Sequence, residues 1–201
     1  MRIGIIGSGA VGRALATGLA RHGHETRIGT RKDEVDGLPV GTPSEVAAEA
    51  DLVFIAVQGA AAVEVAGGLA GELTGKVVVD TTNPLEFSSG SPGLFVGHTD
   101  SLGERVQRAA PRAEVVKGYN TVGNELMVDP DLPGGPPTMF IAGDSERAKA
   151  MVADLLGATG WEVADLGGIE ASRYLEAMCV AWVRAVRGSG NPHQAFKLLG
   201  R

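Results

Sequence analysis

The sequence is poor in cysteine and has no long apolar run, and each of these absences excludes a class of protein. Its single cysteine, Cys179, excludes a disulfide within the chain and is typical of a reducing compartment, so we expect a cytoplasmic protein. The longest charge-free apolar stretch, residues 52–63, has about 12 residues, well short of the ~20 that cross a bilayer. We therefore expect no membrane partner.

The chain also has no excess of positive charge, because its 24 Asp and Glu outnumber its 18 Lys and Arg and give a formal net charge of -6 at pH 7. This balance provides no basic field for nucleic acid, so any phosphate site must be local. Histidine and cysteine do not recur at metal-ligand spacing and there is no G-x-S-x-G motif, which argues against a metal site and against a hydrolase. Of the four histidines, His98 and His193 are the two that could face a substrate.

The most informative segment is the first twelve residues, in which an apolar run leads into glycines at positions 7, 9 and 12. G-x-G-x-x-G between a predicted strand and a predicted helix is the dinucleotide-binding fingerprint of a Rossmann unit. The first glycine permits a tight turn, the second lets the backbone approach a pyrophosphate, and the third allows the helix to pack closely. The expected cofactor contacts in this loop are Gly7, Ser8, Gly9, Ala10, Val11 and Gly12.

The residues that follow complete a βαβ unit. Apolar side chains recur at Val11, Leu15 and Leu19, which predicts a helix, and Gly23 after His22 predicts its end. A second strand is then expected over residues 24–29.

The end of that second strand indicates which dinucleotide binds. NAD-specific units carry Asp or Glu about 20 residues after the glycines, where it bonds the ribose 2′-hydroxyl. This sequence has Thr30, Arg31 and Lys32 there, a hydroxyl and two cations that suit a 2′-phosphate. We therefore expect NADP(H), with these three residues among its contacts. The alternative is a solvated turn in which Asp33 reaches the ribose.

Apolar strands and helices alternate along the rest of the chain. Strands are expected over residues 51–57, 76–80, 113–118, 138–142 and 161–166, and helices over 43–50, 60–73, 101–110, 145–159 and 170–186. Strands without polar alternation predict a parallel sheet that helices cover on both faces. The expected fold class is α/β, a doubly wound, mainly parallel Rossmann sheet with a small C-terminal helical extension.

We divide the chain into an NADP-binding Rossmann domain, residues 1–143, and a small C-terminal α/β extension, residues 144–201. Residues 85–100, rich in glycine and serine, are expected to form a long loop. The apolar stripe of helix 170–186, with Cys179 on it, is expected to be mainly core. In so small an extension it could also form a homodimer interface and contribute to the substrate site.

Ligands of open α/β sheets bind outside the carboxyl ends of the strands. The cofactor contacts expected at these ends are Ala56, Val57, Gln58, Asn83, Pro84, Asn120 and Thr121. Their hydroxyls and amides suit ribose hydroxyls or a nicotinamide carboxamide, and none is an obvious nucleophile or general base. The two asparagines could equally be turn formers, and the proline a rigid corner. The catalytic residues therefore stay unassigned.

Five segments resemble the NADPH-dependent deazaflavin reductases, which are proteins like coenzyme F420:NADP oxidoreductase. These segments are GSGAVG at 7–12, GTRK at 29–32, DTTNPL at 80–85, KGYNTV at 117–122 and AFKLL at 195–199. The resemblance implies that NADP occupies the Rossmann crevice and that the deazaflavin lies over the nicotinamide, so hydride passes without a protein acid or base. A related reductase domain in membrane metalloreductases uses flavin, so the second substrate is either coenzyme F420 or a flavin.

We therefore expect an oxidoreductase that moves hydride between NADP(H) and a flat small-molecule partner by proximity and orientation. Two alternatives stay open: an NADPH-sensing module without turnover, and a small hydroxy-acid or imine reductase. The hydroxy-acid branch carries a catalytic lysine on a large second domain, whereas this chain has no lysine between Lys149 and Lys197.

Overall fold

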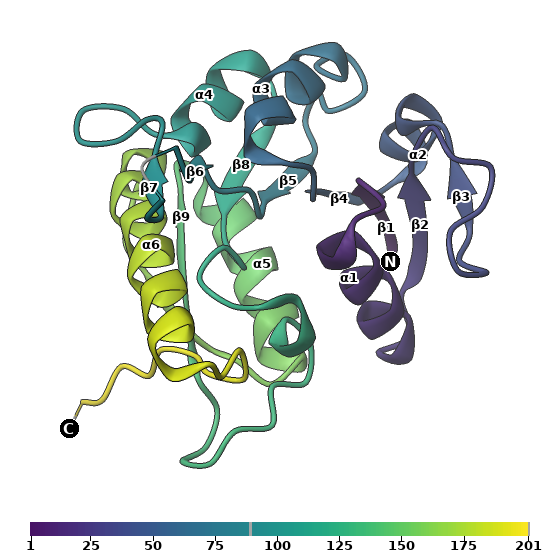
Figure 1. The fold of residues 1–201 in the computed structure, drawn as a ribbon. Coiled ribbons are helices and arrows are strands. Elements are labelled where there is room, and N and C mark those ends of the chain that lie inside the picture. The colour runs from purple at the N-terminus through teal and green to yellow at the C-terminus, as the bar shows by residue number, and fades with distance from the viewer. Residues whose placement is uncertain (89, 201) are drawn as a thin grey trace.

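A computed structural model describes residues 1–88 and 90–200, which form an eight-stranded sheet flanked by helices (Figure 1). The strands are β1 (Arg2–Ile6), β2 (Glu25–Gly29), β3 (Val40–Gly41), β4 (Leu52–Ile55), β5 (Val77–Asp80), β8 (Glu114–Lys117), β9 (Thr138–Gly143) and β10 (Glu162–Asp165), with β6 (Leu85–Glu86) and β7 (Gly93–Leu94) in a separate hairpin. The helices are α1 (Ala10–Arg21), α2 (Pro43–Glu49), α3 (Gly59–Gly68), α4 (Leu102–Ala109), α5 (Glu146–Ala158) and α6 (Ser172–Ser189), with 3-10 turns η1 (Asn124–Leu126) and η2 (Ile169–Ala171).

The sheet has the strand order β10-β9-β8-β5-β4-β1-β2-β3, in which the direction of winding reverses between β1 and β4. In the sheet, the six neighbouring strands β3, β2, β1, β4, β5 and β8 are parallel. Strand β9 is antiparallel to β8 and parallel to β10. This arrangement confirms the predicted mainly parallel Rossmann sheet. Ligands of such sheets bind where the winding reverses, at the carboxyl ends of the strands.

Both faces of the central strands are buried, which explains why these strands are apolar at successive positions. Ile5 and Phe54 belong to a core that includes side chains of α1 and α5, whereas Ile6 and Ile55 belong to a core that includes side chains of α2, α3 and α4. Successive side chains of a strand point to opposite faces. Each face therefore requires its own set of apolar side chains. For this reason, apolar and polar residues do not alternate at these positions of β1 and β4, as they would in a half-exposed strand.

Two segments contain strands that the sequence did not predict. The expected long loop at 85–100 is wrong in part, because it contains the β6–β7 hairpin, which Phe95 anchors by donating its N–H to the Pro84 carbonyl at 2.9 Å. The polar turn before α2 adds the edge strand β3, since the N–H of Thr30 donates to the Gly41 carbonyl at 2.9 Å. Two-residue strands carry little periodic signal, so backbone pairing in the fold decides them.

The C-terminal residues pack on the same sheet. Leu175 and Cys179 of α6 are buried, which confirms that this stripe contributes to the core, and burial raises the pKa of the Cys179 thiol to about 12. The N–H of Thr138, at the start of β9, donates to the Phe196 carbonyl at 2.8 Å. The proposed boundary after residue 143 thus lies between two paired strands, β9 and β10. Within the described part of the chain, no helix is both long and apolar enough to cross a membrane.

Candidate dinucleotide site

The glycine-rich loop lies at the carboxyl end of β1, next to the ends of β2 and β4. Gly7 has a φ of +126°, and its N–H donates to the Gly29 carbonyl at 3.0 Å. A Cβ atom on Gly7 would overlap the Ala56 carbonyl, and one on Gly12 would overlap the Gly7 carbonyl oxygen. A Cβ atom on Gly9 would instead meet no described protein atom within 4 Å. The fold itself requires the outer two glycines, whereas Gly9 leaves space that a ligand can use.

The N-terminus of α1 opens onto this space. Thr42, Ser101 and Ser145 each accept a backbone N–H at the start of α2, α4 and α5. At α1, no side chain of the described residues takes this role, and the first turn has no acidic residue. Free backbone N–H groups at the positive end of a helix attract anions. The loop therefore fits a pyrophosphate.

The end of β2 is tied to the glycine loop through hydroxyl groups. Thr30 Oγ1 donates to Ser8 Oγ at 3.2 Å and accepts the Lys32 N–H at 3.2 Å. Arg31 and Lys32 are exposed, and their side chains form no ion pair with another described residue. The two unpaired cations beside this hydroxyl fit a 2′-phosphate. The alternative contact, Asp33, is exposed on the same turn.

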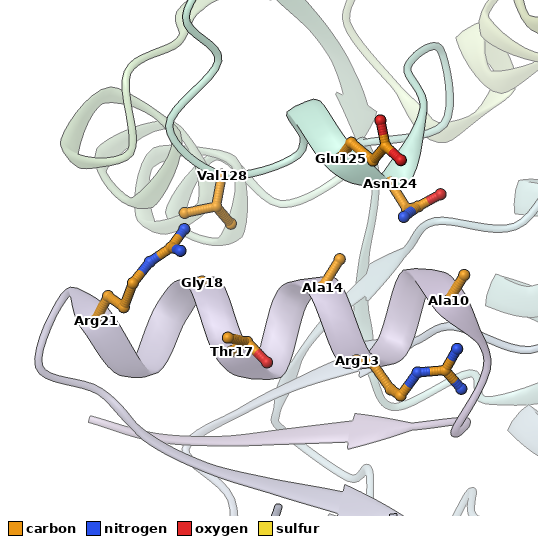
Figure 2. Close-up of a pocket in the computed structure, with 9 residues that line it drawn as sticks. All are labelled: Ala10, Arg13, Ala14, Thr17, Gly18, Arg21, Asn124, Glu125 and Val128. Atoms are coloured by element: carbon orange, nitrogen blue, oxygen red, sulfur yellow. The ribbon is translucent and has the colours of Figure 1, made fainter. Parts of the chain in front are cut away.

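Arg13 also supports the loop, although the sequence analysis did not single it out. Its guanidinium donates to the Ser8 carbonyl at 2.9 Å and lies 3.1 Å from Asp36 Oδ2. It lines a hollow of about 430 Å³ between α1 and η1, where Figure 2 shows Asn124 facing the first turns of α1. Ala10, a predicted cofactor contact, also lines this hollow, so the hollow adjoins the glycine-rich loop. No spacing rule marks an arginine at this position.

The turns after β5 and β8 are joined by the two predicted asparagines. Asn83 Nδ2 donates to the Asn120 carbonyl at 2.8 Å, and Asn120 Nδ2 donates to Asn83 Oδ1 and to the Leu175 carbonyl, both at 3.0 Å. Asn83 is partly exposed, whereas Pro84, Asn120 and Thr121 are buried. The structure thus brings these turns together, and of the four predicted residues it leaves Asn83 accessible.

The end of β4 lies next to the Asn83 turn. A Cβ atom on Gly59 would overlap the Asn83 carbonyl, so α3 begins against that turn. Val57 is partly exposed and Gln58 exposed, whereas Ala56 is buried behind Gly7. The predicted side chains at the carboxyl edge are amides, hydroxyls and alkyl groups, which orient a ligand by hydrogen bonding and packing rather than by acid–base chemistry.

A buried charge cluster at this edge was missed by the sequence analysis. Asp80 ends β5, Lys117 ends β8, and Glu176 lies in α6, and all three are fully buried. A charged residue at the end of an apolar strand, or inside an apolar helix, is unusual enough to be noticed in a sequence. Nothing in the sequence, however, shows that these three side chains meet.

The two candidate histidines lie elsewhere. His98 lines a hollow of about 540 Å³ between β7 and α6, and His193 Nε2 lies 3.0 Å from Glu125 Oε2 in an exposed pair. A substrate contact for either stays a prediction. Among residues 1–88 and 90–200, no group of three His, Cys, Asp or Glu side chains could hold a metal ion.

Comparison with known proteins gives a consistent family. The family described as NADP oxidoreductase coenzyme F420-dependent matches residues 2–84. The crystal structure of an Arthrobacter sp. FB24 protein, proposed to be an F420-dependent NADP reductase, is 38% identical with a TM-score of 0.92, and the match covers 98% of this chain and 99% of that one.

Two curated relatives are more distant in sequence. The F420-dependent NADP reductase of Methanothermobacter marburgensis is 28% identical over 200 residues, covering 88% of each chain. Metalloreductase STEAP3 of Rattus norvegicus is 29% identical over 184 residues, covering 88% of this chain but 36% of the metalloreductase, so this chain spans about a third of that relative's length. The full-length similarity to the Arthrobacter protein, together with the family match over the glycine loop, shows that this chain belongs to the family of coenzyme F420-dependent NADP oxidoreductases.

Proposed function

We propose that this protein transfers a hydride between NADP(H) and a flat redox partner, coenzyme F420 or a flavin, by direct contact of the two rings. The observation that carries the proposal is the pairing of an open, uncapped α1 N-terminus at Gly9 with two unpaired cations, Arg31 and Lys32. The first suits a pyrophosphate and the second a 2′-phosphate. Together they favour NADP(H) along the carboxyl edge of the sheet.

The preference for NADP(H) over NAD(H) follows from these two cations. A charge-assisted hydrogen bond contributes about 1.5–3 kcal/mol, so Arg31 and Lys32 favour the phosphorylated cofactor by roughly 10- to 1000-fold. Thr30 Oγ1 donates its one proton to Ser8 Oγ, so the preference rests on the two cations.

The chemistry proposed here needs no protein acid or base. When bound, NADPH supplies a hydride, which leaves NADP⁺ behind and adds to the acceptor ring together with one proton from water. The chain orients both rings: the β4 end before Gln58 lies beside the glycine loop, the Asn83 turn lies against the start of α3, and the buried Asn120 holds that turn in place. Orientation of two reacting groups at about 3–3.5 Å is a large source of rate by itself.

The identity of the second ring is supported by the relatives. The Methanothermobacter protein is named as F420-dependent and matches over most of both chains, which favours deazaflavin. The rat metalloreductase, matched over about a third of its length, is not named as F420-dependent, so the flavin alternative implied by the sequence resemblance stays open. Stopped-flow mixing of NADPH-loaded protein with F420, FMN and FAD distinguishes them. Oxidation of NADPH no faster than without protein, for all three, would favour an NADPH-sensing module instead.

The cofactor assignment is tested with Arg31→Ala. We expect the Kd of NADPH to rise about tenfold or more and that of NADH to stay within about twofold. Arg112→Ala is the matched control, because Arg112 is an exposed arginine in the turn before β8, at the amino-end edge of the sheet. An unchanged NADPH Kd in Arg31→Ala would overturn the 2′-phosphate assignment.

We also propose a homodimer that forms through the outer face of α6. Leu175 and Cys179 face the core, so the available face is that of Tyr174, which is 67% exposed, and Ala177, which is also exposed. The β6–β7 hairpin lies beside α6 in Figure 1, and its Leu94 lines the same hollow as Tyr174 and Ala177. Exposed apolar side chains on one helix face suit a two-fold interface.

Light scattering tests the dimer. We expect twice the chain mass of 20.6 kDa for the wild type and the chain mass for Tyr174→Glu. Leu198→Glu is the control, because it places the same charge on an exposed apolar residue of the C-terminal tail. A wild-type protein of single-chain mass would contradict the proposal. The cytoplasmic location stays a prediction from the single cysteine.

A further inference from the structure

Three charged side chains meet inside the protein, at the carboxyl ends of β5 and β8. Lys117 Nζ lies 2.9 Å from Asp80 Oδ2 and 2.9 Å from Glu176 Oε1, and it donates to the Thr82 carbonyl at 2.6 Å. All three charged side chains are fully buried. The ammonium group therefore uses its three N–H donors on three different partners.

The carboxylates use their remaining oxygen capacity on backbone and hydroxyl donors. Asp80 Oδ1 accepts the Thr82 N–H at 2.9 Å and the Thr82 hydroxyl at 2.6 Å. Glu176 accepts the N–H groups of Leu102 and Gly103, the first residues of α4, at 3.0 and 2.9 Å. The cluster thus fastens α4 and α6 to the turn after β5.

The charges in the cluster are strongly coupled. Burial alone would lower the pKa of Lys117, but attraction to Asp80 and Glu176 outweighs it, and the pKa is raised above its ordinary value. Apolar side chains of similar volume often stabilise a core as well as a buried ion pair does. Stability alone is therefore a weak explanation for the presence of buried charges here. A requirement for a fixed geometry explains them better.

The cluster is one residue from the Asn83–Asn120 pair, whose amides suit a nicotinamide carboxamide. Lys117 holds the Thr82 carbonyl, and the next residue is Asn83, which pairs with Asn120. From the other direction, Asn120 Nδ2 donates to the Leu175 carbonyl, next to Glu176 on α6. Both sides of the asparagine pair are thus fixed to groups that the cluster holds.

We propose that Lys117 is a positioning residue for the nicotinamide half of the cofactor, acting through Thr82 and the Asn83–Asn120 pair. This inference rests on the proposed function. It predicts that loosening the cluster weakens recognition of the nicotinamide ring and slows hydride transfer. Recognition of the adenosine 2′-phosphate, which belongs to the glycine loop and Thr30–Lys32, is left unchanged.

The test compares two ligands on one variant. For Lys117→Met we expect the Kd of NADPH to rise about 10- to 100-fold, and the hydride-transfer rate to fall by a similar factor, since small misplacements have effects of this size. The Kd of adenosine 2′,5′-bisphosphate, which lacks the nicotinamide, stays within about twofold. Thr82→Val removes one hydrogen bond to Asp80 without removing the buried cation, so it keeps the test available if Lys117→Met does not fold. We expect the same pattern there, with an NADPH effect of about 3- to 10-fold.

The control is a destabilising change away from the edge. Leu73→Ala opens a cavity in a buried core position before β5, and we expect it to leave the ratio of the two Kd values unchanged. Partial rescue of that ratio by Lys117→Arg supports the proposal. An unchanged ratio in both Lys117→Met and Thr82→Val, with wild-type hydride transfer, overturns it. Wild-type protein that binds neither NADPH nor adenosine 2′,5′-bisphosphate would overturn the proposed function, and the inference with it. Wild-type protein that binds both, with variants that keep the wild-type ratio, would overturn the inference alone.

Discussion

The two halves of the carboxyl edge of the sheet differ in how far their polar groups are exposed and bonded. At the glycine loop and the end of β2, the groups are exposed and lightly bonded: Gly9 faces open space, and Arg31 and Lys32 lack ion-pair partners among the described residues. At the ends of β5 and β8, the groups are buried and extensively bonded. The first half offers free donors to an anion, whereas the second half fixes the position of a few amides.

The lysines of the two halves show the same contrast. Lys32 is an exposed cation whose charge is available to a ligand, whereas Lys117 is fully buried and spends its charge on two carboxylates. A flexible, hydrated ammonium suits attraction of a phosphate. A buried ammonium with three partners suits a fixed backbone geometry. In the proposed function, the same residue type therefore serves binding in one half and positioning in the other.

The largest expected effect comes from removing the buried cation. Lys117→Met leaves two buried carboxylates without their counter-charge, which we expect to lower the free energy of unfolding by about 3–5 kcal/mol at pH 7. The pKa of Lys117 in the folded state is raised above its ordinary value of 10.5. The charged lysine therefore stabilises the fold fully below pH 10.5, and this stabilisation decreases as the pH rises from there towards the folded-state pKa. The difference between wild type and variant therefore stays constant up to about pH 10 and then falls by about 1.4 kcal/mol per pH unit.

Urea denaturation at pH 7, 9, 10 and 11 measures this difference. Lys32→Met is the matched control from the exposed half, and we expect no measurable change in its stability. An equal loss of stability in both variants would remove the contrast between the two halves.

A second prediction separates two glycines of the same loop. Gly12→Ala places a Cβ atom against the Gly7 carbonyl, so we expect it to destabilise the fold by about 1–3 kcal/mol and to weaken NADPH binding. Gly9→Ala meets no described protein atom within 4 Å, and Gly9 has a φ of -74°, so thermal unfolding should hardly change. NADPH binding should nevertheless weaken about tenfold, because the methyl group occupies ligand space. Unaltered NADPH binding in Gly9→Ala would show that the pyrophosphate lies elsewhere.

The smallest expected effect is that of Ser8→Ala. This change removes the hydroxyl that receives the Thr30 hydrogen bond at the partly exposed edge of the loop. We expect the Kd of NADPH to rise by less than about fivefold, without loss of stability, as is usual for one neutral hydrogen bond. Isothermal titration provides the measurement. A much larger increase would mean that the Ser8 hydroxyl itself contacts the cofactor and that the exposed half depends on more than free donors.

The parts of the fold that sequence could predict are those with a local cause. The strand–glycine–helix order of residues 2–21 predicted β1, the loop and α1, because each glycine has a local steric role. The apolar runs predicted a sheet buried on both faces, since each strand must supply two cores. The β6–β7 hairpin was not predicted, because its strands are two residues long and depend on backbone pairing.

In the candidate site, the sequence supplied residue types but not their surroundings. It placed Asn83 and Asn120 at neighbouring strand ends, and the structure shows that they pair. It gave no sign that Asn120 and Thr121 are buried, which depends on the packing of α6 over the turn.

By itself, the sequence determined the strand–glycine–helix unit of residues 2–21 and the two cations at the end of β2, because glycine spacing and charge act over a few neighbouring residues. The tertiary structure alone decided that Asp80, Lys117 and Glu176 form one cluster. Those three residues are separated by dozens of positions, and they meet because β5 pairs with β8 and α6 packs against α4 and β9. Electrostatic coupling of buried groups depends on distances of a few ångströms, and the fold sets those distances.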